Sequence, residues 1–331
     1  MSLCCDENWD RRISVGSQAF MQAFKNCSNI NIPSDKELIL SAVTLGTSCY
    51  EGMFQGCTGL TKTPILPATT LSSSCYKDMF SGCSNLTSLS SGQLPATALA
   101  ESCYEGMFSN CTKLATIPAD LLPATTLADM CYHRMFLYCA FTTLPEGLLP
   151  ATNMTFGCYW KMFEDCRSLT TVPDNLLPAM NLATACYARM FFRCTSLQSG
   201  PELPAINPAP ACYFVMFRNC KSITHVKCMV YLDENHRNGN DKASELAPYN
   251  KTEDPPLDNL RTWEVIDMWT VFNKWLTKSP SGESYNVPNN NSCVYEYNSN
   301  MPTSIFSISI AGATLVPSNW TKTPIAPPST P

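Results

Sequence analysis

Apolar residues recur through the first two thirds of the chain in a nine-residue motif, C-Y-x-x-M-F-x-x-C. Its fixed apolar positions, counted from the first cysteine, include i, i+4, i+5 and i+8, which form one stripe on a short helix. Successive copies begin 26 to 28 residues apart. A worn copy, AFMQAFKNC, occupies residues 19–27, and the full copies occupy residues 49–57, 75–83, 103–111, 131–139, 158–166, 186–194 and 212–220.

The segments between the copies are also repetitive. A leucine or isoleucine follows the second cysteine at a fixed distance, and a phrase resembling L-P-A-T-x-L comes later. A short strand is expected after each such leucine, before the prolines. A fixed period of this length is typical of a solenoid. We therefore predict an α/β leucine-rich-repeat solenoid of about eight units, with short parallel strands on one side and short helices on the other. The aligned residues are Leu60, Leu86, Leu114, Leu169, Leu197 and Ile223, and the prolines are Pro64, Pro118, Pro145 and Pro173.

The repeats divide the chain into three parts. Residues 1–18 are an N-terminal segment, residues 19–228 the solenoid and residues 229–331 a C-terminal cap. The cap contains an insert at 231–258 that is rich in charged and turn-forming residues, and a second long piece at 286–314. Either of these segments can hold the specificity, and the role of the 231–258 insert stays open.

The chain has 19 cysteines, of which 14 belong to the motif. The two cysteines of one copy, eight residues apart on a helix, would be about 12 Å apart, too far for a disulfide. Equivalent cysteines of stacked copies would lie about 5 Å apart, so a bridge there is conceivable. Pairing them would break the equivalence of the repeats, and the C-x-x-C spacing of zinc sites is absent. We predict that the motif cysteines are reduced, buried packing residues.

Charge and hydropathy exclude several partners. The net charge of −5 gives no electrostatic basis for binding nucleic acid or an anionic membrane. No apolar run approaches the length of a membrane span, and no signal peptide is visible. Cys5 is followed by two acidic residues, as at the mature end of a bacterial lipoprotein. A lipid anchor at Cys5 and an ordinary N-terminus are both compatible with this start.

The repeats resemble a known family. C-Y-x-x-M-F-x-x-C-x-x-L followed by L-P-A-T-x-L is similar to the BspA-like leucine-rich-repeat proteins of anaerobic, often gut-dwelling, bacteria. The resemblance covers residues 19–226, and residues 270–284 and 316–324 resemble the family's closing segments. It implies a cell-surface or secreted protein that binds host proteins, other cells or glycans, with no catalytic residues. The two long segments of the cap depart from the family and also fit a virion fibre or tip protein of a phage.

Catalytic and cofactor motifs are not found in the sequence. The three histidines stand in no H-E-x-x-H pattern, and the phosphate-binding glycine motifs are absent. The run DENHRNGND at 233–241 lacks the alternation and the closing Glu of a calcium loop. A distant pair of carboxylates, as in glycosidases, stays open. We therefore expect no enzyme activity, no cofactor and no metal.

The variable positions of the motif are the best candidates for binding. In the early copies they carry Gly, Ser and charged residues, as on a solvated face. In the later copies they become aromatic or basic, which is typical of interface anchors. Such a stripe is expected to be covered by the cap, by a second subunit or by an external ligand. The candidate binding residues are His133, Tyr138, Trp160, Phe192, Arg193 and Phe214.

Two functions follow from these features. The first is a non-catalytic adhesin at the cell surface or outside the cell, which binds a protein or glycan on a host or neighbouring cell. The second is a structural protein, such as a fibre or virion subunit, that forms a homo-oligomer through the solenoid.

Overall fold

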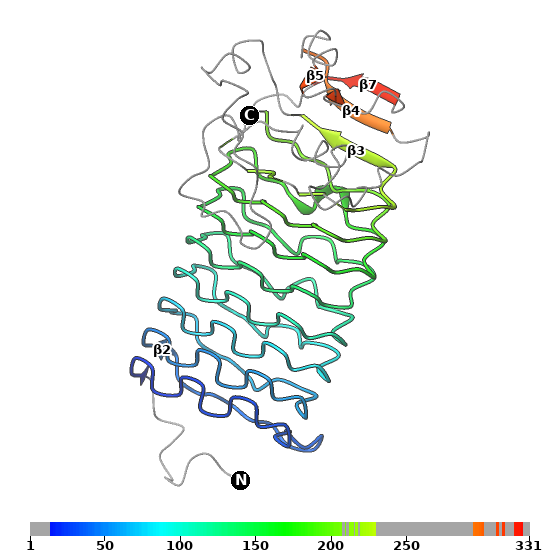
Figure 1. Ribbon diagram of the computed structural model, residues 1–331. Coiled ribbons are helices and arrows are strands. Elements are labelled where there is room, and N and C mark those ends of the chain that lie inside the picture. Colours follow the sequence, from blue (N-terminus) through cyan, green and yellow to red (C-terminus); the bar gives the residue numbers. More distant parts are fainter. Residues whose placement is uncertain are drawn as a thin grey trace.

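The computed structural model describes residues 14–206, 209, 212–214, 216–217, 219–229, 294–300, 309–310, 313–314 and 321–326. The repeats follow one another as coils of a single stack (Figure 1). This arrangement is consistent with the predicted solenoid. Pairing between coils begins before residue 19, because β1 (Ser14–Val15) lies parallel to β2 (Thr44–Leu45).

The nine-residue motif forms a run of turns, so the prediction of short helices is wrong. In the first full copy the N–H of Met53 donates to the carbonyl of Tyr50, three residues earlier, at 3.1 Å. The N–H of Tyr50 donates to the carbonyl of Cys75 in the next copy at 2.9 Å, and that of Phe54 donates to Met79 at 2.9 Å. An α-helix would keep all these bonds within one segment. The backbone instead alternates between closing its own turn and bonding the next coil.

A left-handed residue at every fourth position explains why no helix forms. The φ angle is 52° at Ser48, 58° at Gly52 and 72° at Gly56. The apolar pairs Cys-Tyr and Met-Phe also recur every four residues, whereas a helix turns every 3.6. Glycine and asparagine tolerate this conformation best, and they stand at many of these positions, as at Gly82 and Asn110. The four-residue spacing of Gly and Asn was the sequence signal for turns.

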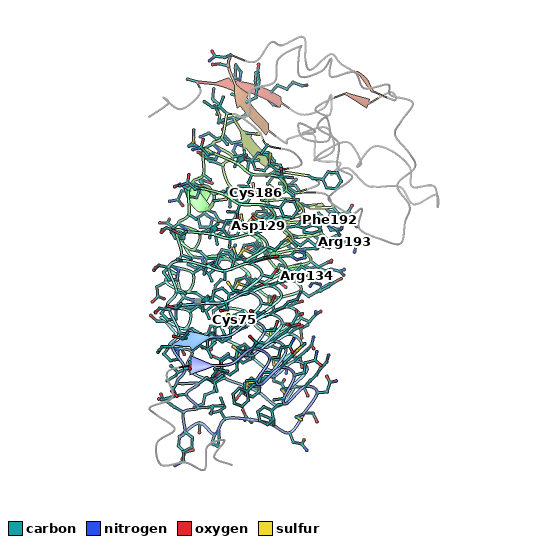
Figure 2. All side chains as sticks on the ribbon, turned by 90° about the vertical axis from the view of Figure 1, so that its left-hand side faces the viewer. Cys75, Asp129, Arg134, Cys186, Phe192 and Arg193 are labelled. Carbon is teal, nitrogen blue, oxygen red and sulfur yellow. The ribbon has the colours of Figure 1, made fainter. Side chains whose placement is uncertain are left out.

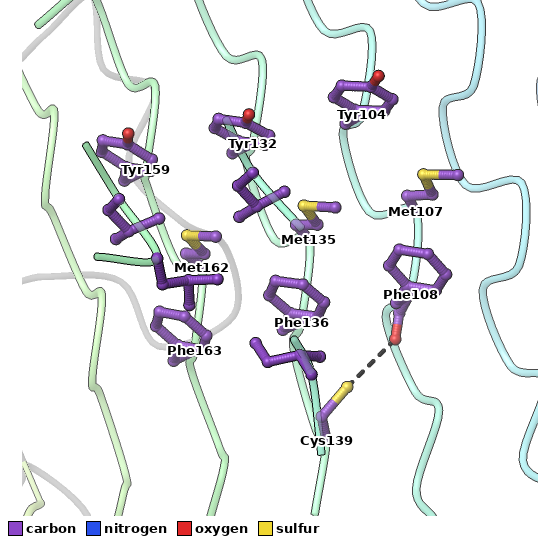
Figure 3. Packing of buried hydrophobic residues seen from close by; sticks show 14 of the residues in the cluster. Tyr104, Met107, Phe108, Tyr132, Met135, Phe136, Cys139, Tyr159, Met162 and Phe163 are labelled. Atoms are coloured by element: carbon purple, nitrogen blue, oxygen red, sulfur yellow. Dashed lines mark hydrogen bonds between the residues drawn. The ribbon is translucent and has the colours of Figure 1, made fainter. Parts of the chain in front are cut away.

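Two ladders of aromatic rings form the centre of the stack. One runs through the motif tyrosines from Phe20 to Tyr213, and the other through the motif phenylalanines from Phe24 to Phe217. Neighbouring rings have centroids 5.5–5.9 Å apart and planes within 16° of each other. Offset stacking of this kind is favourable for aromatic pairs. The motif methionines lie between the two ladders and are buried (Figure 3).

The motif cysteines are buried and unbridged, so the prediction of buried packing thiols is confirmed. The structure adds a hydrogen-bonding role to the second cysteine of each copy. The Sγ of Cys139 donates to the carbonyl of Phe108 in the preceding coil at 3.3 Å (Figure 3). The second cysteines of the other full copies make the same contact at 3.0–3.2 Å. Cys27 of the worn copy is exposed.

Short parallel pairings join the segments between the motifs. Single bridges occur where strands were expected, two residues before Pro118 and before Pro173. They are shorter than the predicted strands. The bridges are Ile39↔Ile65, Thr44↔Thr70, Ser88↔Thr116, Ala98↔Thr126, Thr143↔Thr171 and Asn153↔Asn181. The remaining local elements are a 3-10 helix, η2 (Asp174–Leu176), and an antiparallel pair, β5 (Ser309–Ile310) and β6 (Ala313–Thr314).

Parallel pairing continues past the last motif. β3 (His225–Cys228) bridges back to Ser199, and β4 (Val294–Asn298) lies parallel to β3. β7 (Thr321–Ile325) lies parallel to β4. The pairing therefore crosses the expected boundary between solenoid and cap. β7 has the sequence TKTPI, which also stands at 61–65, and this identity was a signal that the tail contains a strand of the repeat type.

Candidate functional site: the variable face

The third, fourth, seventh and eighth residues of each motif copy form a surface that we call the variable face. Hydrogen bonds between coils hold equal positions of neighbouring copies beside each other. Arg134, Phe192 and Arg193 accordingly lie along one side of the stack (Figure 2). The face therefore presents columns of side chains, one from each coil.

A network of charged side chains on the face is centred on Glu105, in the third full copy. Its carboxylate lies 3.1 Å from the Lys77 ammonium and 2.9 Å from the Arg134 guanidinium. Burial raises the pKa of Glu105, but its contacts with His133 and Lys77 lower it by more, so the pKa lies well below its ordinary value. Three consecutive coils are thus linked through one buried, ionised carboxylate.

His133 was expected on the surface, but it is buried in the face. Its ring stacks on Trp160 with centroids 4.5 Å apart and an angle of 13° between the planes. Burial lowers the pKa of His133 to about 4, although the hydrogen bond with Glu105 opposes the shift. At neutral pH the ring is therefore uncharged, and it supports the indole rather than offering a charge to a ligand.

Phe192 and Phe214 were expected in a stripe covered by the cap, a second subunit or a ligand, and both are buried within this chain. They pack together with Ala185 and Ala188, and Trp160 lies partly buried against the same group. Both alanines are fully buried. Phe192 and Phe214 therefore contribute to the packing of the coils, while Trp160 keeps part of its surface open.

Basic side chains lie over these rings. The Lys161 ammonium is 4.7 Å from the centre of the Trp160 ring. The guanidinium groups of Arg189 and Arg193 are 4.4 and 5.0 Å from the centre of the Phe192 ring. Such contacts are attractive because a ring face carries negative potential.

Arg189 also makes an ion pair across coils, with Glu164 at 2.7 Å. Burial raises the pKa of Glu164, and the charges of Arg189 and Lys161 act against this shift. The fourth positions of the fourth to sixth full copies thus carry basic groups, namely Arg134, Lys161 and Arg189. The rings come mostly from third positions, with Phe192 at a seventh position.

An exposed region of the later copies surrounds Asp165. This carboxylate is fully buried, and its Oδ1 accepts from Nε and a terminal nitrogen of Arg167 at 2.9 and 2.8 Å. Arg193 lies 3.8 Å from its other oxygen. The side chains of Arg167 and Arg193 are 62% and 47% exposed, and Tyr138 is 40% exposed. A partner can reach these three side chains directly.

The predicted stripe is therefore two groups. Trp160 contacts His133 and the phenylalanine cluster, whereas Tyr138 and Arg193 belong to the exposed region around Asp165. Arg193 connects the two groups, because its guanidinium also lies over the Phe192 ring. Sequence reasoning missed the charged residues that organise both groups. The signal was available as opposite charges at related positions of adjacent copies. The missed residues are Glu105, Glu164, Asp165, Arg167 and Arg189.

The arrangement suits recognition. Glu105, Glu164 and Asp165 each contact at least one cation. Within the described part of the chain, no group of three or more His, Cys, Asp or Glu side chains is arranged to hold a metal ion. What remains accessible is a surface of arginine, tyrosine and indole.

Comparison with known proteins gives one similar solved structure, a leucine-rich cell surface protein from Faecalibacterium prausnitzii A2-165. It is 18% identical to this chain, with a TM-score of 0.27, over 66% of this chain and 67% of that one. No family model and no curated protein matches the chain.

Several expectations fall outside the described residues. They include the possible anchor at Cys5, the insert at 231–258 and most of the expected cap. Among the residues that the structure covers, no helix has the length and hydropathy needed to cross a bilayer.

Proposed function

We propose that this chain is a non-catalytic binding protein that acts at the cell surface or outside the cell. It recognises a protein or glycan on a host or neighbouring cell through the variable face of the fourth to sixth full copies. The resemblance of the repeats to BspA-like proteins supports the location and the class of function.

One observation carries this proposal. The residues that build the stack are the same from copy to copy, and their rings stack with the same spacing throughout. The variable face changes along the same stack, from Gly52 and Gly56 in the first full copy to Trp160 in the fifth. Since stacking alone does not require these changes, they support a role in recognition.

The test uses binding of the fluorescently labelled protein to intact epithelial and bacterial cells. The double variant Tyr138→Ser, Trp160→Ser is expected to lose most of the bound signal while its far-UV circular dichroism stays unchanged. The control variant Glu51→Ser changes the third position of the first full copy, and it is expected to bind as the wild type does. Equal binding by the double variant and the wild type would contradict the proposal.

The alternative, a fibre or virion subunit, has one observation in its favour. In the worn first copy, Phe20 and Met21 are each 39% exposed. The Phe20 ring stacks on Tyr50 of the next coil, so its other side is available for an end-to-end contact between copies of this chain. Light scattering separates the two functions. A monodisperse monomer supports the binding protein, and a stable trimer or larger assembly supports the subunit.

A further inference from the structure

We infer that Tyr138, Arg167 and Arg193 form a binding site for an acidic carbohydrate, which they hold by a carboxylate or sulfate group. The inference rests on the proposed function and names the chemistry of its ligand.

The first support is the backbone conformation at the eighth motif position. Tyr138, Asp165 and Arg193 follow one another in this column with φ angles of 61°, 57° and 60°. The other copies fill the column with residues that tolerate a left-handed conformation, glycine or asparagine. Tyrosine and arginine are disfavoured there by their Cβ atoms. A left-handed residue recurs at every fourth position of the stack, so the conformation alone does not mark the site. What distinguishes the site is that the fourth to sixth full copies depart from glycine and asparagine in this column.

The second support is the buried carboxylate beneath the site. Asp165 holds one edge of the Arg167 guanidinium through two hydrogen bonds to Oδ1. Its other oxygen lies within ion-pair distance of Arg193. Two guanidinium groups and one carboxylate leave a local charge of about +1. An arginine has five N–H donors, and Asp165 uses two of those on Arg167. The site therefore offers a positioned, positive surface to one anionic group.

The rigidity of the backbone is the third support. The N–H of Tyr138 donates to the carbonyl of Glu164 at 3.0 Å, and the N–H of Asp165 donates to that of Phe192 at 2.8 Å. The Arg193 guanidinium also packs on the Phe192 ring. Little ordering is then required when a ligand binds, which favours affinity.

The surroundings favour a carbohydrate over an acidic peptide. Asn110 precedes Tyr138 in the eighth-position column, and Ser168 adjoins Arg167; both are exposed and uncharged. A run of acidic residues needs a run of positive charges, whereas this site has one positive centre flanked by amide and hydroxyl groups. A sugar with one charge, several hydroxyls and an apolar ring face matches that centre and the exposed Tyr138 ring.

Isothermal titration calorimetry tests this inference with five probes at low salt. They are polygalacturonate for carboxylates, heparin for sulfates, dextran as a neutral sugar, polyglutamate as an acidic peptide, and sodium sulfate. Binding to at least one acidic polysaccharide, and neither to dextran nor to polyglutamate, is expected. Which of the two polysaccharides binds identifies the anionic group. Inorganic sulfate is expected to compete with it weakly.

The variants Tyr138→Asn and Arg193→Asn introduce the residue found at this position in other copies. Each is expected to weaken polysaccharide binding about tenfold or more. For Tyr138→Asn an unchanged or higher melting temperature is expected, because the strain is relieved. The matched control Gly82→Asn changes the same position in the second full copy and is expected to bind as the wild type does.

Three results would overturn the inference: no binding to either acidic polysaccharide, equal binding to polyglutamate, or full binding by both asparagine variants. If the protein attaches to cells through Tyr138 and Trp160 but binds neither polysaccharide, the proposed function stands and this inference fails. Polysaccharide binding through the site without attachment to cells would leave this inference standing and contradict the proposed function.

Discussion

At the scale of single residues, the second cysteine of each motif copy has two roles. Its side chain is small enough to fill the space between coils, and its thiol donates to a phenylalanine carbonyl of the preceding coil. That carbonyl already accepts from the backbone N–H of its own turn. The thiol therefore satisfies a second lone pair on a buried oxygen, which alanine cannot do. Burial also raises the pKa of these thiols, as for Cys83 at about 12, so they are poor nucleophiles.

The exchange Cys139→Ala tests this role. It removes both the packing of the sulfur and the hydrogen bond to Phe108, so a loss of roughly 1–3 kcal/mol in unfolding free energy is expected. Urea denaturation measures this change in unfolding free energy. The control Cys27→Ala, in the exposed thiol of the worn copy, is expected to change stability by less than about 0.5 kcal/mol. Equal effects of the two changes would contradict the account.

The buried His133 makes stability depend on pH. Because its pKa in the folded state lies below the ordinary value, at about 4, the unfolded chain takes up a proton first as the pH falls. Unfolding free energy is expected to fall from about pH 7 to pH 4, by on the order of 1–3 kcal/mol. Its neighbour Glu105 has a lowered pKa. The stability that ionised Glu105 contributes is therefore lost only as the pH falls below about 4.5.

The variant His133→Gln is expected to flatten the stability profile between pH 7 and pH 4, as followed by urea midpoints. His225→Gln, in a partly exposed residue of β3, serves as the control and should keep the slope of the wild type. A slope that persists in the His133 variant would show that other groups cause it.

Single variants of Phe192 and Tyr138 distinguish a residue that packs the coils from a residue proposed to contact a partner. Phe192 is buried with Phe214 and Ala188, so Phe192→Ser is expected to cost roughly 3 kcal/mol of unfolding free energy. Tyr138 is exposed, and Tyr138→Ser is expected to stay within about 0.5 kcal/mol. Thermal melts of the two single variants measure the difference. A small effect of Phe192→Ser would mean that the cluster does not support the stack.

At the scale of the element, the left-handed positions decide between turns and helices. Gly82 has a φ angle of 76°, and a Cβ there would meet no atom closer than 3.6 Å. Gly82→Ala is therefore expected to destabilise through the backbone alone, by about 1–2 kcal/mol. In an exposed helix the same change would stabilise by about 1 kcal/mol. The sign of the change in urea midpoint distinguishes the two structures, with Gly16→Ala as a control outside the left-handed region.

The sequence predicts the stacking of repeats better than their local conformation. The fixed period and the register of residues such as Leu60 and Leu86 indicate coils placed one on another, because equal positions must meet. The apolar stripe fits a helix with 3.6 residues per turn nearly as well as it fits a run of four-residue turns. In the sequence, the recurring Gly and Asn are the feature that distinguishes turns from a helix. For the variable face, the side-by-side placement of His133 and Trp160 followed from the repeat, because both are third positions of adjacent copies. The repeat did not predict that His133 and Phe192 are buried. Their burial depends on contacts with residues such as Glu105 and Ala188.

At the scale of the whole molecule, the proposed function assigns folding to the stack and recognition to side chains on one side of it. In the described part of the chain, backbone hydrogen bonds join each coil to adjacent coils, so every copy repeats the same stabilising contacts. Some residues of the variable face, such as Phe192, also pack between the coils, whereas Tyr138 is exposed. A patch of this kind on one side of a long, regular stack gives a partner a rigid surface without altering the core.

The most direct test of this separation exchanges the seventh and eighth positions of the fourth full copy for those of the third. The two changes are Leu137→Ser and Tyr138→Asn, while His133 and Arg134 stay in place because both contact the buried Glu105. Thermal unfolding and cell binding are measured on the same preparation. The account predicts a cooperative transition within a few degrees of the wild type, together with loss of most of the cell binding. A variant that keeps its binding, or one that no longer folds, would contradict it.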